Sequence, residues 1–198
     1  MPYRGLTSPV LRSTLRPIFN DPQHRFRSRS KWEGAVRVLW DEATHREEWY
    51  AALALAKHRH YRPWLDSDLM PLLRHLIETG AWWDVVDDIA THLVQAVLLA
   101  GPGVEGPRLR EWSVDECLWV RRTAIIAQVG SGRHADPALL ADVIEPNLAD
   151  RDFFIRKAIG WALRDHAKAD PAWVRAFVAA HDSDLSGLSR REALRRLG

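Results

Sequence analysis

The sequence predicts an all-helical protein. Apolar residues recur at helical spacing along almost the whole chain, and no segment shows the alternation of apolar and polar residues that is typical of a half-buried strand. Residues that favour helix starts, such as Asp before Pro, separate the apolar stretches. The 198 residues are 46% hydrophobic and 27% charged, which suffices for one domain with a substantial core. We therefore expect a single domain over residues 1–198.

Two helices are expected in the first forty residues. The first begins at Ser8-Pro9, and Pro17 should disturb its end, because proline lacks the backbone N–H that a helix interior needs. The second follows the turn at residues 20–22, and it carries three apolar residues at helical spacing: Trp32, Val36 and Leu39.

Three further helices are expected before residue 100. Thr44 and Glu47 have the spacing of a capping box, in which each side chain satisfies the other residue's free backbone N–H. The next helix ends at Gly80 and has an apolar stripe that consists of Leu69, Leu72, Leu73, Leu76 and Ile77. A long, strongly apolar helix should then run from Trp83 to Leu99.

Proline residues indicate helix boundaries in the second half of the chain. Pro102 and Pro107 should break it before a helix of about residues 115–129. In the pairs Asp136-Pro137 and Asp170-Pro171, an N-cap residue precedes a proline at the first helical position, where the missing N–H does no harm. Each pair therefore indicates the start of a helix.

The spacing of the helices indicates a repeat architecture. A helix of about residues 152–168 lies between the two Asp-Pro pairs, and Ser189 and Glu192 have the spacing of a second capping box for a short terminal helix. Helix pairs thus return about every 35 to 45 residues, which is typical of a HEAT-like α-solenoid of antiparallel helix pairs. Such stacks curve, and we expect a concave basic face that binds an extended partner.

The charged residues are clustered rather than in large excess. The formal net charge is only +2, so attraction to nucleic acid must come from local basic clusters. Three clusters are present: Arg25, Arg27, Arg29 and Lys31; residues 58–62; and Arg190, Arg191, Arg195 and Arg196. Taken alone, such runs are more often solvated faces than binding sites.

Membrane and secretory roles are not expected. The longest apolar runs are far shorter than the roughly 20 residues that a membrane span needs. The N-terminus has no central apolar stretch followed by a small-residue cleavage site. We therefore expect a cytoplasmic protein.

Several segments, taken in order, resemble the AlkD family of DNA alkylation-repair glycosylases. The signature stretches are residues 81–87 (AWWDVVD), 119–125 (WVRRTAI) and 152–164 (DFFIRKAIGWALR). Residues 5–9 (GLTSP) resemble an early element of the family, and residues 188–193 (LSRREA) resemble its closing helix. The resemblance thus covers essentially the whole chain, although family members usually have further helical sequence before the early element. Two explanations are open: the true start lies before Met1, or this member lacks the N-terminal capping helices.

The resemblance implies a site of four residues. Trp83 and Trp161 match the two active-site tryptophans of the family, Asp87 its catalytic aspartate and Arg122 its DNA-contacting arginine. It also implies a monofunctional hydrolase of base excision repair that removes alkylated bases from double-stranded DNA without flipping them out of the stack. We expect a monomer that associates with the nucleoid when it binds DNA.

The residues themselves are compatible with these roles and with simpler ones. Trp83 and Asp87 are four apart, so on a helix their side chains share one face. A core tryptophan beside a surface aspartate that pairs with an arginine is the simpler alternative. Arg122 could hold a phosphate in bidentate fashion or form a surface ion pair.

Trp161 lies between two cations on the same helical face. Lys157 precedes it by four residues and Arg164 follows it by three, a pattern that suits contact with a sugar-phosphate backbone. A core role for Trp161 is the alternative. We predict that Lys157 and Arg164 bind DNA together with Arg122.

Cleavage of an alkylated base from its sugar requires few catalytic side chains. A purine alkylated at its 3- or 7-position is already cationic, so its glycosidic bond is weak and needs no general acid. As the bond breaks, positive charge moves onto the deoxyribose, where the Asp87 carboxylate can stabilise it and orient a water molecule. The faces of Trp83 and Trp161 would favour the same cationic sugar by about 0.5 to 2 kcal/mol each.

No cofactor or metal is expected, since the pair His58 and His60 lacks further ligands. Two alternative functions remain open. The chain could be a non-catalytic protein that binds damaged or branched DNA, or a HEAT-type scaffold for protein interactions.

Overall fold

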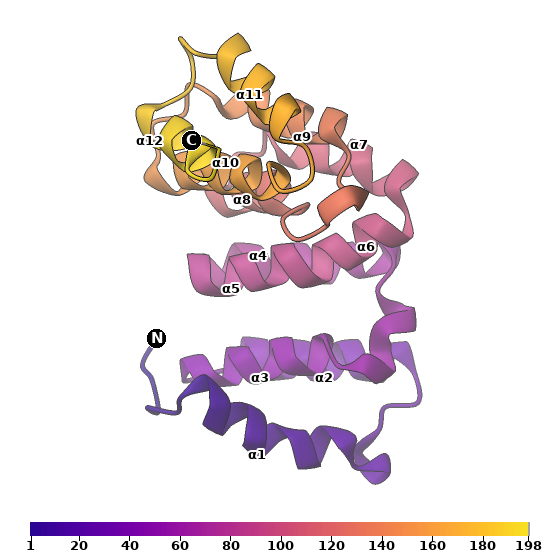
Figure 1. Ribbon diagram of the computed structural model, residues 1–198. Coiled ribbons are helices and arrows are strands. Elements are labelled where there is room, and N and C mark those ends of the chain that lie inside the picture. Colours follow the sequence, from indigo (N-terminus) through magenta and orange to yellow (C-terminus); the bar gives the residue numbers. More distant parts are fainter. Residues whose placement is uncertain (198) are drawn as a thin grey trace. The chain divides into compact units, whose positions relative to one another are not determined.

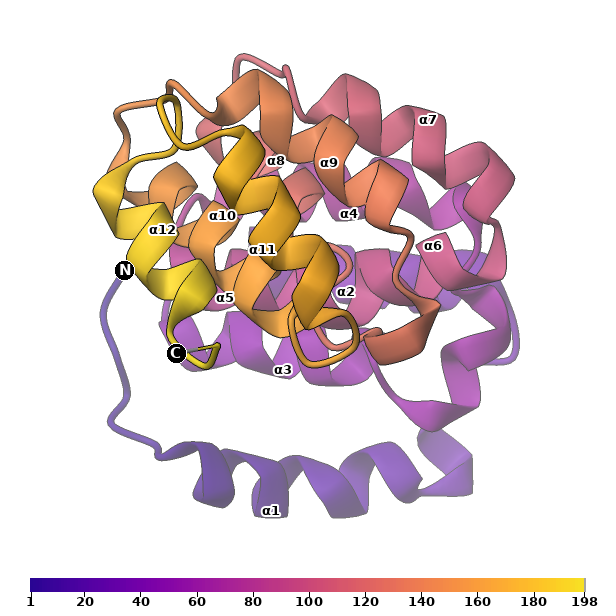
Figure 2. The same cartoon turned by 45° about the horizontal axis from the view of Figure 1, so that its top comes forward.

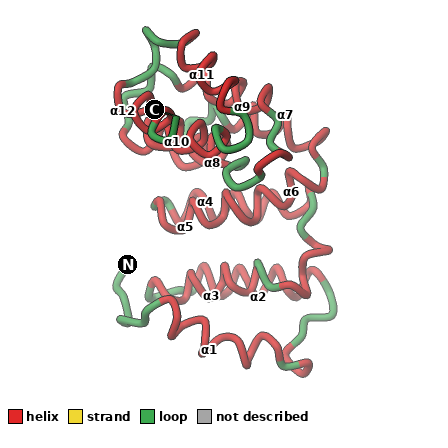
Figure 3. The backbone as a smooth tube through the Cα atoms, viewed as in Figure 1, coloured by secondary structure: helices red, strands yellow, loops and turns green. Residues whose placement is uncertain are grey.

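A computed structural model describes residues 1–197, and all regular secondary structure in that range is helical (Figure 1 and Figure 3). The all-helical prediction is therefore confirmed. The chain divides into two compact units, one from Met1 to Leu72 and one from Leu73 onward. Within residues 1–197, no helix has both the length and the apolar character that crossing a bilayer requires. The single repeat domain with a concave basic face stays a prediction.

The first unit is built around a pair of packed helices. It contains α1 (Ser8–Asn20), α2 (Arg29–Asp41) and α3 (Arg46–Ala56), and α2 lies against α3 (Figure 1). The apolar faces of this pair form the core, with buried Trp32, Val36, Trp40, Ala52, Leu53, Leu55 and Ala56. No residue of α1 is buried.

Helix α1 contains Pro17 in its last turn and ends at Asn20. Pro17 thus lies near the end that it was expected to disturb, and the disturbance itself stays a prediction. A proline inside a helix removes one backbone hydrogen bond, and the residues that follow it can still continue the helix.

The expected capping box at Thr44 and Glu47 is wrong by one residue. The N-cap of α3 is His45, and the Glu48 carboxylate accepts the backbone N–H of His45 at 3.2 Å. Glu47 is buried instead, and its carboxylate accepts the backbone N–H groups of Arg4 at 2.9 Å and Leu6 at 3.1 Å. These hydrogen bonds lower the pKa of Glu47 and fasten the N-terminal segment to α3.

The second unit contains the rest of the helices. Helix α4 (Met70–Gly80) spans the boundary between the units, and its end at Gly80 is as predicted. The helices that follow are α5 (Trp83–Asp88), α6 (Gln95–Ala100), α7 (Pro102–Trp112), α8 (Leu118–Ile126), α9 (Pro137–Ile144), α10 (Phe153–His166), α11 (Pro171–Ala180) and α12 (Gly187–Leu194). Helix α10 is central, because it packs against α8, α11 and α12 (Figure 2).

The long apolar helix that was expected from Trp83 to Leu99 is present with a change in its middle. A π-helical segment, Ile89–Val94, joins α5 to α6, so the backbone stays helical from 83 to 100. In a π-helix the hydrogen bonds reach five residues back, which widens the turn and shifts the faces that follow. Asp87 lies on the last turn before this change.

Helix α7 corrects the expectation that Pro102 and Pro107 break the chain. Pro102 begins the helix, at a position where no backbone hydrogen bond is lost, and Pro107 lies inside it. The helix tolerates Pro107 at the cost of one hydrogen bond.

Two of the three expected caps in the last third of the chain are confirmed. The Asp136 carboxylate accepts the backbone N–H of Ala138 at 2.9 Å, and the Asp170 carboxylate accepts that of Trp173 at 2.9 Å. The box of Ser189 and Glu192 is wrong. The N-cap of α12 is Ser186, whose hydroxyl accepts the N–H of Ser189, while Glu192 binds two cations of α10.

Helices α10 and α12 pack closely at Gly160. A Cβ atom at this position would lie 2.5 Å from Cβ of Glu192 and 3.0 Å from the carbonyl oxygen of Ser189. Glycine is therefore required here by the contact between the helices and not by its own backbone conformation.

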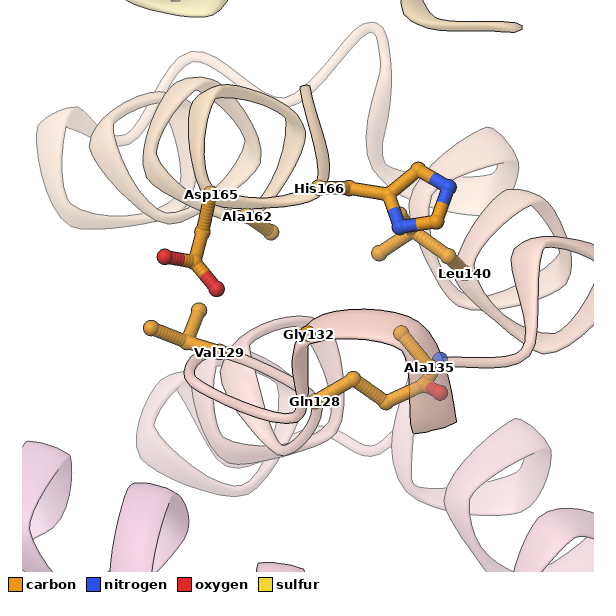
Figure 4. Close-up of a pocket in the computed structure, with 8 residues that line it drawn as sticks. All are labelled: Gln128, Val129, Gly132, Ala135, Leu140, Ala162, Asp165 and His166. Atoms are coloured by element: carbon orange, nitrogen blue, oxygen red, sulfur yellow. The ribbon is translucent and has the colours of Figure 1, made fainter. Parts of the chain in front are cut away.

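A small cavity lies beside the end of α10 (Figure 4). Asp165 projects from α10 toward Val129, and the ring of His166 projects toward Leu140 on α9. The cavity has a volume of about 10 Å³, close to the space of one water molecule. His166 is 8% exposed, its ring meets that of Trp173 edge-on, and neither ring nitrogen has a hydrogen-bond partner among residues 1–197. Burial lowers the pKa of His166, although the charges of Asp170 and Asp165 oppose this shift.

We predict that Gly160→Ala destabilises the protein by about 1 to 3 kcal/mol, because the added methyl group forces α12 away from α10. The free energy of unfolding, measured by denaturant titration, checks this. Gly103→Ala is the matched control, since nothing lies within 4 Å of a Cβ atom at Gly103. The control should be neutral or more stable by up to about 1 kcal/mol. Equal stability of Gly160→Ala and the native protein would contradict the packing argument.

We predict that His166 makes the protein less stable on acidification. Its pKa is lower in the folded chain than in the unfolded chain, so below about pH 6.5 the unfolded state binds the proton more readily and stability falls. The measurement is the free energy of unfolding from about pH 7.5 to pH 5. His166→Leu should weaken this dependence, whereas His134→Gln, at an exposed histidine, should retain it. A dependence unchanged in His166→Leu would exclude His166 as its source.

Candidate active site

The candidate site lies where α5, α8 and α10 meet in the second unit, and its centre is an ion pair. Helix α8 packs against both α5 and α10. Arg122 on α8 donates from Nε to Oδ1 of Asp87 and from Nη2 to Oδ2, both at 2.7 Å. Its third nitrogen, Nη1, donates to the carbonyl oxygen of Phe154 at 2.6 Å. One guanidinium therefore connects all three helices.

This ion pair is largely withdrawn from solvent. Arg122 is 5% exposed, and 16% of the Asp87 side chain is exposed. A buried charge that loses its partner is strongly unfavourable, so each side chain fixes the position of the other. Arg122 was expected to contact DNA, and in this arrangement all three of its side-chain nitrogens donate to groups of the protein. Its DNA contact stays a prediction.

The protein environment shifts the pKa of Asp87. Burial is the largest influence and raises the pKa of Asp87 above the ordinary value, and the neighbouring Asp84 carboxylate acts in the same direction. The hydrogen bonds and the charge of Arg122 oppose the shift. A shifted carboxyl group in a paired, partly accessible position is typical of functional sites, although structural ion pairs produce such shifts too.

Trp83 presents its ring to solvent beside this pair. It is the first residue of α5, one turn before Asp87, and it is 48% exposed, an unusual state for so large an aromatic side chain. Ala81 just before it has φ of +39°, a left-handed conformation that costs free energy in a residue with a Cβ atom. This strained turn between α4 and α5 sets where α5 begins and thus where Trp83 lies.

An aromatic cluster supports the same region, and sequence reasoning missed its role. The ring of Trp119 lies 5.0 Å from that of Phe154 and 6.2 Å from that of Trp82, between ring centres. Trp82 and Phe154 are 5.8 Å apart, and Phe153 adjoins Phe154 at 5.5 Å. These residues lie at the N-terminal ends of α5, α8 and α10. The abundance of tryptophan was the available signal, but it does not show which rings meet.

Trp161 and its flanking cations form a second group, further along α10. Trp161 is half-buried, and no hydrogen bond or ring contact joins it to Asp87 or Trp83 in the described part of the chain. Lys157 binds Glu192 at 3.1 Å between Nζ and Oε1, and Arg164 binds the other carboxylate oxygen of Glu192.

Glu192 is a further residue that sequence reasoning misread. Burial alone would raise its pKa, but the hydrogen bond from Lys157 and the nearby cations lower it, so the carboxylate stays charged. The cations predicted to bind DNA are therefore already paired, and their DNA contacts stay predictions.

Comparisons with known proteins agree with the fold. A solved structure described as a predicted DNA alkylation repair enzyme from Enterococcus faecalis matches with a TM-score of 0.86 at 24% identity, over 99% of this chain and 88% of that chain. At this identity the likeness concerns the fold. No curated protein matches the chain. The family model described as DNA alkylation repair enzyme matches residues 1–197. The chain therefore belongs to the DNA alkylation repair enzyme family.

Proposed function

We propose that this protein is a monofunctional DNA glycosylase that hydrolyses the N-glycosidic bond of cationic 3- or 7-alkylated purines in duplex DNA. Family membership gives it a role in DNA repair with DNA as its substrate. The finer proposal depends on one observation: a carboxylate that accepts two hydrogen bonds from Arg122 and lies one helical turn after the exposed Trp83. The protein would act as a monomer and would leave the lesion stacked in the duplex.

The proposed reaction breaks the bond between the sugar and the base. The alkylated purine carries a positive charge, so it departs as a neutral base with the bonding electron pair, and the positive charge passes to the deoxyribose. Water then adds to the sugar carbon and loses a proton, which leaves an abasic site. A fixed carboxylate stabilises the charged sugar without the reorganisation that solvent would need.

Asp87 retains the capacity for this role while it is paired. Each carboxylate oxygen can accept about two hydrogen bonds, and Arg122 uses one on each oxygen. The remaining positions are available to orient the attacking water. Arg122 would thus act as a positioning residue for Asp87 in addition to its predicted contact with DNA.

The tryptophans would bind the sugar through their faces. Trp83 is accessible and adjacent to Asp87. Trp161 belongs to the proposal through the family resemblance and through its position on α10, whose first turn contacts Arg122. Lys157 and Arg164 would contact phosphates only in exchange for part of their pairing with Glu192, which stabilises the free protein.

We predict that Asp87→Asn lowers single-turnover release of 7-methylguanine from methylated duplex by about 100- to 1,000-fold, since it removes the charge that stabilises the sugar cation. Binding of undamaged duplex should remain. The double variant Asp87→Leu/Arg122→Met serves as a control for folding, because replacement of both members of a buried pair is often neutral for stability. A folded double variant without base release would show that loss of the pair abolishes activity without unfolding the protein. Native release rates in Asp87→Asn would refute it.

We predict that Trp83→Ala lowers the same rate by about 2- to 30-fold, the factor that corresponds to a cation–π contribution of about 0.5 to 2 kcal/mol. Trp82→Ala is the matched control. Trp82 is similarly exposed at 46%, but its ring contacts Trp119 and Phe154. The control should lose stability more than rate. Equal losses of rate in the two variants would argue against a specific role of the Trp83 ring.

A further inference from the structure

The first unit brings together two basic segments that are more than thirty residues apart in the sequence. Residues 25–27 of the first segment, with His60 and Trp64 of the second, border an open cavity of about 390 Å³. Its lining combines cations and rings: Pro22, Arg25, Phe26, Arg27, His60 and Trp64. We call this feature the basic pocket.

The basic pocket has a rigid aromatic base. Tyr61 is buried, and its ring stacks on those of Trp32 at 5.5 Å and Trp64 at 5.3 Å. The Tyr61 hydroxyl accepts the backbone N–H of Phe26 at 3.3 Å, and the two rings lie 6.2 Å apart. Because Phe26 is fixed in this way, Arg25 and Arg27 on either side of it are held at the pocket.

The arginines of the basic pocket are exposed and lack acidic partners. Neither Arg25 nor Arg27 forms an ion pair within residues 1–197, and the same holds for the exposed Arg59 and Arg62 beside them. Among the acidic side chains close by in the sequence, Glu33, Asp66 and Asp68 pair with Arg29, and Asp21 lies 3.6 Å from His24.

The histidines beside these arginines respond to the concentrated positive charge. Burial is the first cause of a lowered pKa for His58 and for His60, and the charges of Arg25 and Arg59 add to it. Positive charge is therefore concentrated at the basic pocket.

We infer that the basic pocket is a second DNA-binding site, in which Arg25 and Arg27 hold the phosphodiester backbone and the rings of His60 and Trp64 support the adjacent deoxyribose. Guanidinium groups bind phosphate oxygens in bidentate fashion, and rings beside them bind nucleotides without regard to sequence. This site lies in the first unit, whereas Asp87, Trp83 and Trp161 all belong to the second. The inference rests on the proposed function only in that DNA is the substrate.

The test compares two double variants of the full-length protein by fluorescence anisotropy with an undamaged duplex over a series of salt concentrations. Arg25→Gln/Arg27→Gln should weaken binding about tenfold and reduce the salt slope by about 2, since each lost phosphate contact accounts for about 0.9. Arg12→Gln/Arg16→Gln is the matched control, because it removes the same charge from exposed positions on α1. The control should retain most of the native affinity and slope. Equal effects in the two variants, or none in the first, would overturn the inference.

A local measurement separates DNA from free anions. The NMR signal of the His60 ring should shift when undamaged duplex is added and should be unaffected by the same ionic strength of sodium phosphate. A shift with phosphate alone would assign the pocket to a free anion and overturn the inference. Both measurements use undamaged DNA, so they stay valid if the protein releases no base. Asp87→Asn, by contrast, should lose base release but keep the native DNA affinity, the native salt slope and the native shift of the His60 signal.

Discussion

The geometry of the candidate site depends on the buried ion pair between Asp87 and Arg122. Two charges removed from water are stable only when each finds a matching partner, and here the planar guanidinium meets both carboxylate oxygens at 2.7 Å. The third nitrogen satisfies the carbonyl of Phe154. Because a displacement of α5, α8 or α10 would break one of these bonds, the pair fixes the three helix ends that border the site.

The packing around this ion pair also fixes the positions of the helices that border the site. Trp119 and Phe154 fill the space between the ends of α8 and α10 with rings, and Gly160 lets α12 approach α10 closely enough for Glu192 to reach two cations. The strained turn at Ala81 places the first residue of α5 beside the pair. Local sequence therefore determines the helices, while contacts between helices determine where the polar groups of the site lie.

The difference between local signals and contacts between helices explains which features the sequence could predict. Helices follow from apolar periodicity, and Asp before Pro correctly marks the starts of α9 and α11, because both signals act within a few residues. Two capping boxes failed because Glu47 and Glu192 bind groups that are distant in the sequence, which spacing alone cannot show. The candidate residues came from resemblance to a family. Their arrangement did not, since Asp87 and Arg122 are 35 positions apart and their pairing depends on how α5 meets α8.

The distribution of paired and unpaired cations suits a cationic lesion. A free guanidinium beside the reacting sugar would repel both the alkylated purine and the positive charge that develops on the deoxyribose. Near the candidate site, Asp87 neutralises Arg122, while the single carboxylate of Glu192 offsets one of the two positive charges of Lys157 and Arg164. Arginines without acidic partners add to the attraction for the phosphate backbone, and those of the basic pocket belong to a different unit of the chain. Pairing of the Arg122 guanidinium with Asp87 would thus limit the electrostatic opposition to bond cleavage, while unpaired arginines attract the DNA.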